Sequence, residues 1–341
     1  MVLPLLLLLG PPGHGVTAYG ADVAAAVARQ HRHVHVVQVE AAAAVVPAVD
    51  GAPRVHLHVT DRLLGSSPEE AAAQLERLAA GTRLTITLHD VPQATDGTMH
   101  ERRRAAYTRM VRAADGIVVN SRHEQLLSAD FLPDASALAV IPLGARVAVP
   151  PPAPAFSAGG DLRVLIAGFV YPGKGHAVAI DAAADAAACL RAAGHDVRRV
   201  AVRAIGGPSR GHEADLGRLR ARGAELGVEF EVTGFLDDEA FAAALAAEGI
   251  PVAAHEHVSA SRSMLDWVER GRRPLVVESR YAAEMDALRP GTLSRYRPAD
   301  LASRLAASWL RPELTRLPVG TPLVPTLDDV AHSYVRWWEQ S

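Results

Sequence analysis

The segment that decides the fold is Leu162-Arg-Val-Leu-Ile-Ala-Gly-Phe-Val-Tyr-Pro-Gly-Lys-Gly-His176, near the middle of the 341-residue chain. Its first six residues are almost all apolar, which is typical of a strand buried on both faces of a parallel sheet. A loop with three glycines follows, and the Ala-rich stretch after it predicts a helix over 174–193. A buried strand, a glycine loop and a helix make up the repeating unit of a doubly wound α/β domain.

The same alternation of short apolar runs and Ala-rich amphipathic stretches extends along the whole chain and predicts parallel sheets. Strands are expected at Val2–Leu9, Val34–Val39, Val55–Val59, Leu84–Leu88, Gly116–Val119, Ala137–Ile141, Leu162–Ala167, Arg198–Ala204, Glu229–Thr233, Ile250–Ala254 and Pro274–Val277. Helices are expected at Val16–Gln30, Pro68–Ala80, Thr98–Ala113, Ser121–Ala129, Lys174–Ala193, Gly211–Glu225, Asp237–Ala247, Met264–Arg270, Pro298–Trp309 and Leu327–Glu339. Ser67 and Ser121 stand where a serine caps a helix start.

A Pro- and Gly-rich stretch separates the two halves of this pattern. It reads Val149-Pro-Pro-Pro-Ala-Pro154, followed by Ser157-Ala-Gly-Gly160, and has the composition of an interdomain linker. We therefore predict one doubly wound domain over residues 1–150, a second over 151–325 and a terminal helical segment over 326–341. Ligands of open α/β sheets bind beyond the carboxyl ends of the strands, so two such domains facing each other would form a cleft.

The composition excludes several classes of protein. Lys plus Arg is 35 and Asp plus Glu is 38, and this near-neutral balance gives no support to a nucleic-acid binder. The single cysteine, Cys189, excludes an internal disulfide and a cysteine-based zinc site. The apolar start, Met1 to Leu9, has no Lys or Arg before it and runs into a glycine loop, which favours a strand over a signal peptide. We expect a soluble, cytoplasmic protein without a membrane span.

The loops after the predicted strands contain the residues that are candidates for ligand binding or catalysis. Gly10-Pro-Pro-Gly-His-Gly-Val-Thr17 leads into a helix, where free backbone N–H groups suit a phosphate or a sugar hydroxyl, or form only a tight turn. It is neither a dinucleotide fingerprint nor a P-loop. His89 and Asp90 leave the strand at Leu84–Leu88, and the histidine either binds a sugar and assists proton transfer or is a satisfied strand-end residue.

The second half offers a cation and a serine-rich helix start. Lys174 lies between Gly173 and Gly175 at the mouth of a predicted helix, where an ammonium suits a diphosphate, although a solvated turn lysine has the same pattern. Three serines at alternate positions, Ser259, Ser261 and Ser263, come after the strand Ile250–Ala254. Their hydroxyls and backbone amides either hold a phosphate or sugar or serve as a helix cap.

Three histidine pairs at i, i+2 spacing raise the question of a metal. They are His33 with His35, His56 with His58, and His255 with His257. The spacing places both rings on one face of a strand, but no third ligand stands out, so no metal site and no required cofactor are predicted.

Two charged motifs of the first half allow two interpretations each. Asp61 and Arg62 are candidates for an acceptor-side polar group or a surface ion pair. Glu101-Arg-Arg-Arg104 is interpreted as a solvated helix face, with contact to anionic lipid as the alternative.

Seven pieces, taken in order and spacing, resemble the retaining nucleotide-sugar glycosyltransferases of the GT-B fold, of the large family 4 type. The pieces are Gly13-His-Gly-Val16, Thr87-Leu-His-Asp-Val-Pro92, Gly116-Ile-Val-Val-Asn-Ser121, Val140-Ile-Pro-Leu-Gly144, Gly168 to Gly175, Val232-Thr-Gly-Phe235 and Gly271 to Val277. The resemblance covers nearly the whole chain. It implies two Rossmann-like domains facing a cleft, with the last helix crossing back onto the first domain.

The resemblance also implies roles for individual residues. His89 would contact the transferred sugar and Lys174 would neutralise the departing diphosphate, which makes these two the candidate catalytic residues. The candidate donor-binding residues are Gly15, Gly168, Lys174, Gly234, Leu236, Ser259, Ala260, Ser261 and Asp266. The candidate acceptor-side residues are His14, Asp61, Arg62 and Asp90.

Two positions depart from the family pattern. Phe169 stands where the family has an arginine, so one phosphate-binding cation is missing, and Arg262, Arg203 and Arg146 are the candidates to replace it. Val258 stands where the family has the first of two glutamates, and Glu256 is two residues out of register. Asp266 occupies the second position, where a carboxylate would hold the ribose hydroxyls.

The activity that these observations predict is hexosyl transfer with retention, from GDP-mannose or UDP-glucose to a saccharide or small glycoside. Positive charge and amide dipoles stabilise a leaving diphosphate, and a metal is at most stimulatory. The alternatives are a nucleotide-sugar epimerase of the same fold and a non-catalytic protein that binds nucleotide-sugars. The oligomeric state stays open.

Overall fold

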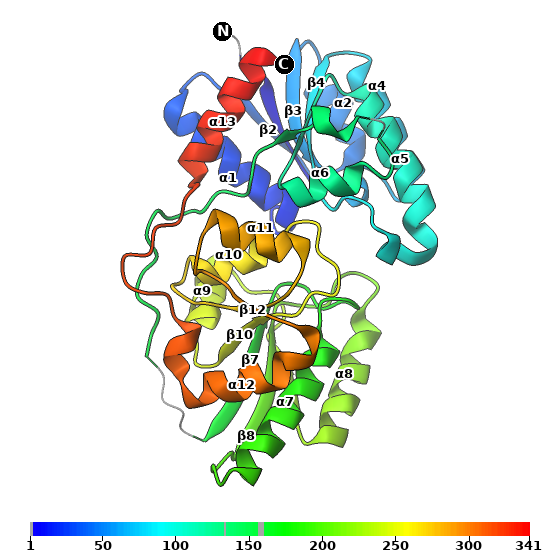
Figure 1. Cartoon of the computed structure of the whole chain (residues 1–341). Coiled ribbons are helices and arrows are strands. Elements are labelled where there is room, and N and C mark those ends of the chain that lie inside the picture. The colour runs from blue at the N-terminus through cyan, green and yellow to red at the C-terminus, as the bar shows by residue number, and fades with distance from the viewer. Residues whose placement is uncertain (1–2, 133, 156–159) are drawn as a thin grey trace. The chain divides into compact units, whose positions relative to one another are not determined.

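The computed structural model describes residues 3–132, 134–155 and 160–341 (Figure 1). Contacts within the chain divide it into two compact units, Met1–Arg146 with Val324–Ser341, and Val147–Leu323. Two pieces of the predicted organisation, Val2 of the first strand and Ser157–Gly159 of the linker, lie outside the described ranges.

The first unit is built on a six-stranded parallel sheet. Its strands lie in the order β2 (Val36–Val39), β1 (Leu5–Leu9), β3 (Arg54–Val59), β4 (Arg83–Leu88), β5 (Gly116–Val119) and β6 (Ala139–Val140). Its helices are α1 (Gly15–Gln30), α2 (Val45–Ala48), α3 (Asp61–Leu64), α4 (Pro68–Ala79), α5 (His100–Ala113), α6 (Arg122–Ser128) and α13 (Leu327–Gln340). The predicted cap serines are confirmed, because Ser67 and Ser121 accept hydrogen bonds from the amides of Glu70 and Glu124.

The second unit repeats this architecture. Its parallel sheet has the order β12 (Ser294–Tyr296), β11 (Leu275–Val277), β10 (Ile250–Ala253), β7 (Asp161–Ala167), β8 (Arg199–Ile205) and β9 (Glu229–Val232). The helices are α7 (His176–Ala192), α8 (Glu213–Leu226), α9 (Asp238–Ala246), α10 (Arg262–Val268), α11 (Arg280–Leu288) and α12 (Leu301–Leu310). In both sheets the chain connects parallel neighbours through helices, as the alternation of the sequence predicts.

Aliphatic residues fill the core of each unit. Val55, Leu57 and Ile86 on the central strands of the first sheet are fully buried. In the second unit Val164 and Ala183 are equally buried, and the small side chain of the alanine lets α7 pack closely on the sheet. Burial of such residues is the main stabilising term of the fold, at about 25 cal/mol per Å² of apolar surface.

The C-terminal helix completes the first unit, which confirms the expected crossing back. The red helix α13 packs against the blue helix α1 in Figure 1. Thr326 and Asp329 form a capping box at its start, and Tyr334 and Trp338 are fully buried against the sheet. The helix therefore belongs to the core of the first unit.

Four elements were not predicted from the sequence, namely the four-residue helices α2 and α3, the strand β12 and the helix α11. The strand β12 has only three residues, two of them polar, which is too short for a period-two signal. The helix α11 begins at Ser279, whose hydroxyl caps the amide of Ala282, but its charged composition hides the apolar face that Tyr281 and Met285 bury. The strand β12 forms the edge of the second sheet next to β11, and α11 lies between these two strands in the chain.

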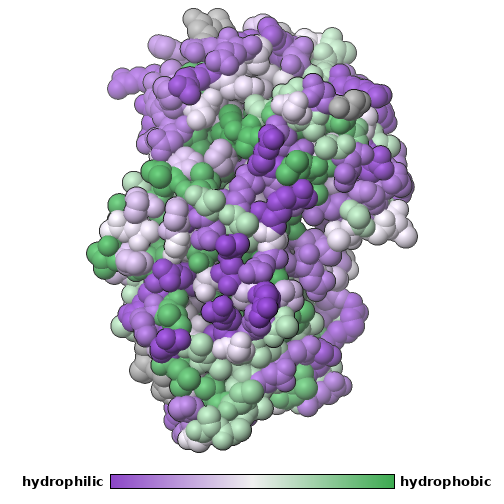
Figure 2. Space-filling view, in the orientation of Figure 1, coloured by the Kyte–Doolittle hydropathy of each residue, from purple (hydrophilic) through white to green (hydrophobic). Residues whose placement is uncertain are grey.

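No helix within the described ranges is long and apolar enough to cross a membrane. Figure 2 shows hydrophilic and hydrophobic residues interspersed over the visible face of the molecule. Isolated apolar residues of this kind are ordinary for a protein surface.

Candidate functional site

His89 leaves β4 at its carboxyl end and is buried beside a second histidine. Its Nε2 lies 2.9 Å from Nδ1 of His58, which comes from β3, and its Nδ1 lies 3.4 Å from Nδ2 of Asn120. Burial holds the pKa of both histidines well below its ordinary value, and the charge of His56 beside His58, or of His58 beside His89, would lower it further. The pair is therefore neutral, and both ring nitrogens of His89 already face protein groups.

The residues around the pair explain the Asn-Ser motif that follows β5. Asn120 Nδ2 donates to the Leu88 carbonyl at 3.0 Å and to the Glu124 carboxylate at 3.1 Å, so its amide nitrogen faces His89. Glu124 also accepts from the backbone amide of Asn120 at 2.6 Å while Ser121 caps the same helix. This motif fixes the start of α6 and one side of the His89 ring.

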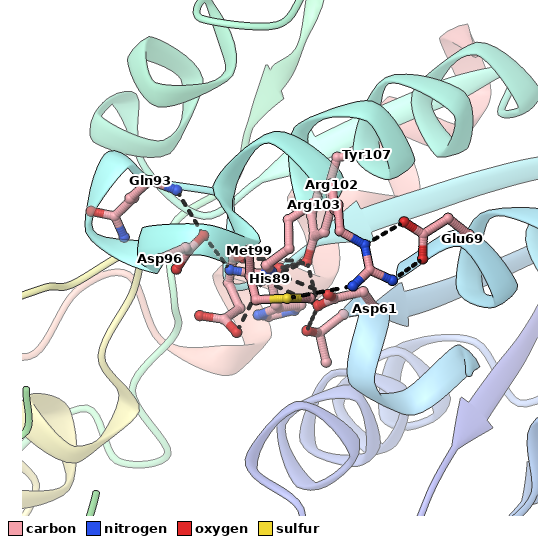
Figure 3. Close-up of polar contacts among 11 residues, drawn as sticks. Asp61, Glu69, His89, Gln93, Asp96, Met99, Arg102, Arg103 and Tyr107 are labelled. Carbon is pink, nitrogen blue, oxygen red and sulfur yellow. Dashed lines mark hydrogen bonds and ion pairs between the residues drawn. The ribbon is translucent and has the colours of Figure 1, made fainter. Parts of the chain in front are cut away.

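A buried arginine dominates the polar contacts beside this histidine (Figure 3). Arg103 on α5 donates to both carboxylate oxygens of Asp61 at 3.1 Å, to Asp96 at 2.6 Å and to Asp90 at 3.3 Å. Its Nη2 also donates to the Asp90 carbonyl at 2.7 Å, and Tyr107 donates to the His89 carbonyl at 2.8 Å. Helix α5 thus holds the backbone that follows β4.

This network corrects two interpretations of the sequence. Arg103 is 6% exposed, so the face of α5 that carries it is not solvated; the predicted exposure holds for Arg102, which pairs with Glu69. Asp61 is 5% exposed, so its ion pair is not at the surface. Helical periodicity places one of three adjacent arginines toward the sheet, but a run of like charges hides which one.

The other acceptor-side candidates differ in setting. Asp90 has a φ of 54° and a half-exposed side chain. His14 caps α1 by accepting from the Val16 amide at 3.3 Å, and burial lowers its pKa. Gly15 begins α1 with open space around its α-carbon, and Arg62 on α3 is exposed. A ligand would reach Asp90 and Arg62 without displacing the core.

His56 and His58 face an aromatic cluster contributed by α13. The His56 ring meets the rings of Tyr334 and Trp338 at centroid distances of 5.4 and 5.1 Å. Its nitrogens contact the hydroxyls of Thr85 at 3.0 Å and Thr87 at 3.2 Å, and burial lowers its pKa to about 3. This pair of histidines is therefore used in packing, and the described residues contain no cluster of three or more His, Cys, Asp or Glu arranged for a metal ion.

In the second unit, Lys174 lies in the loop between β7 and α7. It is 6% exposed, and its Nζ lies 2.8 Å from Nε2 of His255 and 3.1 Å from Oγ of Ser263. Burial lowers its pKa to about 8, although the charge of Asp266 opposes the shift. The lysine is therefore a buried cation held by two neutral acceptors.

Glycines shape the backbone around this lysine. Gly168 has a φ of 102°, and a Cβ there would stand 3.1 Å from Nζ of Lys174. Gly175 has a φ of 90°, and a Cβ there would meet the Ala254 carbonyl oxygen at 2.1 Å. Any side chain at Gly175 would therefore push the lysine loop away from the end of β10.

The serine-rich segment caps α10 as its cap interpretation predicts. Ser261 Oγ accepts from the Met264 amide at 3.4 Å, while the Ser261 amide donates to the Tyr281 hydroxyl at 3.0 Å. Ser259 is buried beside it, and Ala260 is partly buried. A phosphate held by the Ser261 amide would have to compete with the tyrosine.

The candidate replacements for the missing arginine all face carboxylates. Arg262 pairs with Asp266 at 3.0 Å and with Glu269. Arg203 lies 3.7 Å from Glu231, and Arg146, in the first unit, lies 2.8 Å from Asp22. Asp266, assigned by resemblance to the ribose, is thus engaged with Arg262.

An aromatic pair stands where the family arginine is expected. The ring of Phe169, just beyond β7, meets that of Phe235 at a centroid distance of 5.6 Å in an edge-to-face arrangement. Phe235 is 71% exposed, and Gly234 before it has a φ of 74° with open space around it. Leu236 packs partly onto the small apolar cluster around Trp267.

Two signals in the sequence were missed. His255 follows the end of β10 after a single residue, Ala254, so the rule that placed His89 at a strand end also applies to it. Lys174 is the single lysine of the chain, whereas the other 34 basic side chains of the Lys and Arg total of 35 are arginine. A chain that uses arginine everywhere else keeps at this position a compact ammonium whose pKa responds to burial.

Neither protein-family models nor curated protein sequences match this chain. Solved structures do. HepE from Anabaena in complex with UDP and glucose matches with a TM-score of 0.67, 16% identity and coverage of 99% of this chain and 98% of that one. HepE in complex with UDP-glucose matches with a TM-score of 0.68 and 16% identity, and the match covers 98% of this chain and 97% of that one. Sucrose-phosphate synthase from Thermosynechococcus elongatus matches with a TM-score of 0.67 and 14% identity, and the match covers 99% of this chain and 96% of that one. The chain therefore has the GT-B fold of two Rossmann-like domains, as the sequence predicted.

Proposed function

We propose that the protein is a retaining glycosyltransferase that moves a hexose from a nucleotide-sugar to a saccharide or small glycoside. The observation that carries this proposal is Lys174, a buried cation at the carboxyl end of β7 that faces neutral acceptors. Parallel α/β sheets bind their ligands at this edge, and an ammonium there suits a diphosphate. UDP-glucose is the favoured donor, since HepE is described in complex with UDP-glucose, and GDP-mannose is the alternative.

In the proposed reaction the bond between the sugar anomeric carbon and the diphosphate oxygen breaks while Lys174 stabilises the charge on the leaving group. The acceptor hydroxyl attacks from the same face and gives its proton to a leaving phosphate oxygen. Asp266, whose charge acts on Lys174, and Glu269 both pair with Arg262, which does not favour either carboxylate as a nucleophile. His89 would hold the sugar only after one of its ring contacts gives way.

The test begins with nucleotide binding, measured by calorimetry with UDP, GDP, ADP and TDP and their sugars. Selective binding of UDP and UDP-glucose is expected, and turnover with a panel of saccharides follows, with the anomeric configuration of the product read by NMR. Lys174→Met should lower kcat by about 10²–10³-fold, in line with the loss of one charge-stabilising group. Unchanged turnover in this variant, or an inverted product, would contradict the mechanism.

A non-catalytic nucleotide-sugar-binding protein is the second candidate. It is favoured by Phe169 and by the pairing of Arg262, Arg203 and Arg146 with carboxylates. It predicts tight binding of one nucleotide-sugar with neither transfer nor hydrolysis in any acceptor mixture. The nucleotide-sugar epimerase predicted as a further alternative would instead change the sugar without an acceptor.

A further inference from the structure

The contact between Lys174 and His255 joins the ends of two neighbouring strands. Lys174 follows β7 and His255 follows β10, and these strands pair through Ile250 with Val164 and Pro251 with Leu165. The 2.8 Å separation of Nζ and Nε2 brings together two side chains that are each only 6% exposed. The parallel register thus delivers both residues to one point of the sheet edge.

The chemistry of the two groups assigns the hydrogens between them. A protonated lysine can only donate, so Nε2 of His255 accepts and the imidazole carries its proton on Nδ1. A second hydrogen of Nζ goes to Ser263 Oγ. The third has no acceptor within the described part of the chain, and its direction is set once the other two are fixed.

A neutral acceptor holds the ammonium without cancelling its charge. A carboxylate in place of His255 would form an ion pair and compete with any anionic ligand. Burial, followed by the charges of Lys174 and His176, holds the pKa of His255 well below its ordinary value, so the imidazole stays neutral. The attraction of Lys174 for an anion is therefore retained.

The histidine is kept at a cost to stability. Its Nδ1 is buried and has no hydrogen-bond partner within the described residues. A buried N–H without a partner destabilises a fold, and such violations of packing rules are typical of functional positions. His257, two residues further along the chain, is exposed to solvent, so its ring does not carry the cost of a buried N–H group.

We propose that His255 is a positioning residue, which accepts one hydrogen of Lys174 and so directs the remaining one toward a diphosphate oxygen of the donor. This inference rests on the proposed function for the identity of the ligand. The positioning itself concerns only the free protein, and the two parts are tested separately.

The first experiment follows Lys174 without any ligand. Because it is the only lysine, ¹³Cε-lysine labelling gives one side-chain signal, whose titration is followed from pH 6 to 10 by NMR. His255→Leu should move the midpoint down by about one pH unit, since the ammonium loses an acceptor. His255→Gln, whose amide oxygen reaches the same place, should restore it, and His257→Leu should leave it unchanged. An unchanged midpoint in His255→Leu overturns the positioning role.

The second experiment measures UDP and uridine binding by calorimetry. His255→Leu should weaken UDP binding about tenfold and leave uridine binding unchanged, because one charge-assisted hydrogen bond to the diphosphate is lost. His255→Gln should recover most of the UDP affinity. Equal UDP affinity in His255→Leu and the unaltered protein overturns the role toward the diphosphate.

Two further outcomes are decisive. If the unaltered protein binds neither UDP nor GDP, the proposed function fails and the diphosphate is overturned as the ligand, while the lysine titration still decides the positioning. If His255→Leu fails to fold, Ser263→Ala removes the other acceptor of Lys174 and should lower the same NMR midpoint. An unchanged midpoint in Ser263→Ala, or a lowered midpoint in His255→Gln, would then overturn the inference.

Discussion

The two units each bury a basic side chain near the carboxyl edge of the sheet, and they treat its charge in opposite ways. Arg103 in the first unit contacts three carboxylates, those of Asp61, Asp90 and Asp96. Lys174 in the second unit contacts only the neutral groups of His255 and Ser263, as far as the described residues show. The pKa of Arg103 is raised despite its burial, whereas burial lowers that of Lys174 to about 8.

This difference indicates that the charge of Arg103 serves the fold, whereas we infer that the charge of Lys174 can attract an anionic ligand. The carboxylates around Arg103 offset the cost of burying its charge and tie α3, the turn after β4 and helix α5 together. Lys174 contacts no carboxylate among the described residues and is compensated only by the more distant charge of Asp266, so we infer that its charge remains available to an anion. The comparison predicts opposite effects when each charge is removed.

The largest effect is expected for Arg103→Met. Removing the guanidinium leaves a buried carboxylate at Asp61 without its partner, which should lower the free energy of unfolding by about 3–5 kcal/mol. Urea unfolding followed by circular dichroism measures the change. Arg102→Met is the matched control, because the adjacent side chain is exposed, and it should change stability little. Equal losses in the two variants would break the comparison.

Lys174→Met should raise the free energy of unfolding, which is the opposite of the effect expected for Arg103→Met. The folded-state pKa of about 8 lies below the ordinary lysine value of 10.5, so the unfolded chain binds the proton more tightly. The resulting destabilisation is complete below pH 8 and disappears as the pH rises toward 10.5. At pH 7 the variant should gain about 3 kcal/mol in the free energy of unfolding. A loss of stability instead would show that Lys174, like Arg103, serves the fold.

The sequence predicted the fold because the fold depends on a repeated pattern. Long apolar runs such as Leu162–Ala167 and the capped helices at Ser67 and Ser121 carry local signals that do not depend on distant residues. Two of the missed elements, β12 and α11, lack such signals and form because β11 and the core give them a partner. Tertiary packing, which no local pattern encodes, decides these cases.

The site was predictable in position but less so in its contacts. Strand ends located His89 and Lys174, because parallel strands deliver their following residues to one edge. The partners Arg103 and His255 were misjudged, since which residue of a run faces inward depends on the exact start of a helix or the exact end of a strand. Residue type and strand position therefore predicted where His89 and Lys174 lie, but did not assign their hydrogen bonds.

The acid stability of the two units should sharpen the comparison further. His56 in the first unit and His176 in the second both have a pKa lowered to about 3, first of all by burial. The unfolded chain, with a value near 6.5, binds more protons, so stability falls as the pH drops below 6.5. The loss at pH 5 is about 2 kcal/mol for each histidine.

Replacing either histidine by leucine should remove its share of this pH dependence in unfolding measured from pH 7.5 to 5. At pH 7.5 only His56→Leu should be destabilised, because it loses its contacts with Thr85 and Thr87, whereas neither ring nitrogen of His176 has a hydrogen-bond partner in the described ranges. An undiminished pH dependence in His176→Leu would show that this histidine is not neutral when buried.

The smallest effects belong to two buried tyrosine hydroxyls, one in each unit. Tyr334 shares a 2.8 Å hydrogen bond with Thr87, and Tyr281 accepts from the Ser261 amide at 3.0 Å. Each change to phenylalanine should cost about 1 kcal/mol of unfolding free energy. Only Tyr281→Phe frees an amide at the start of α10, so it alone should tighten UDP binding, by about threefold, if that amide holds a phosphate. Tighter binding in Tyr334→Phe as well would place the cause outside the second unit, and unchanged binding in both would remove the Ser261 amide from the donor site.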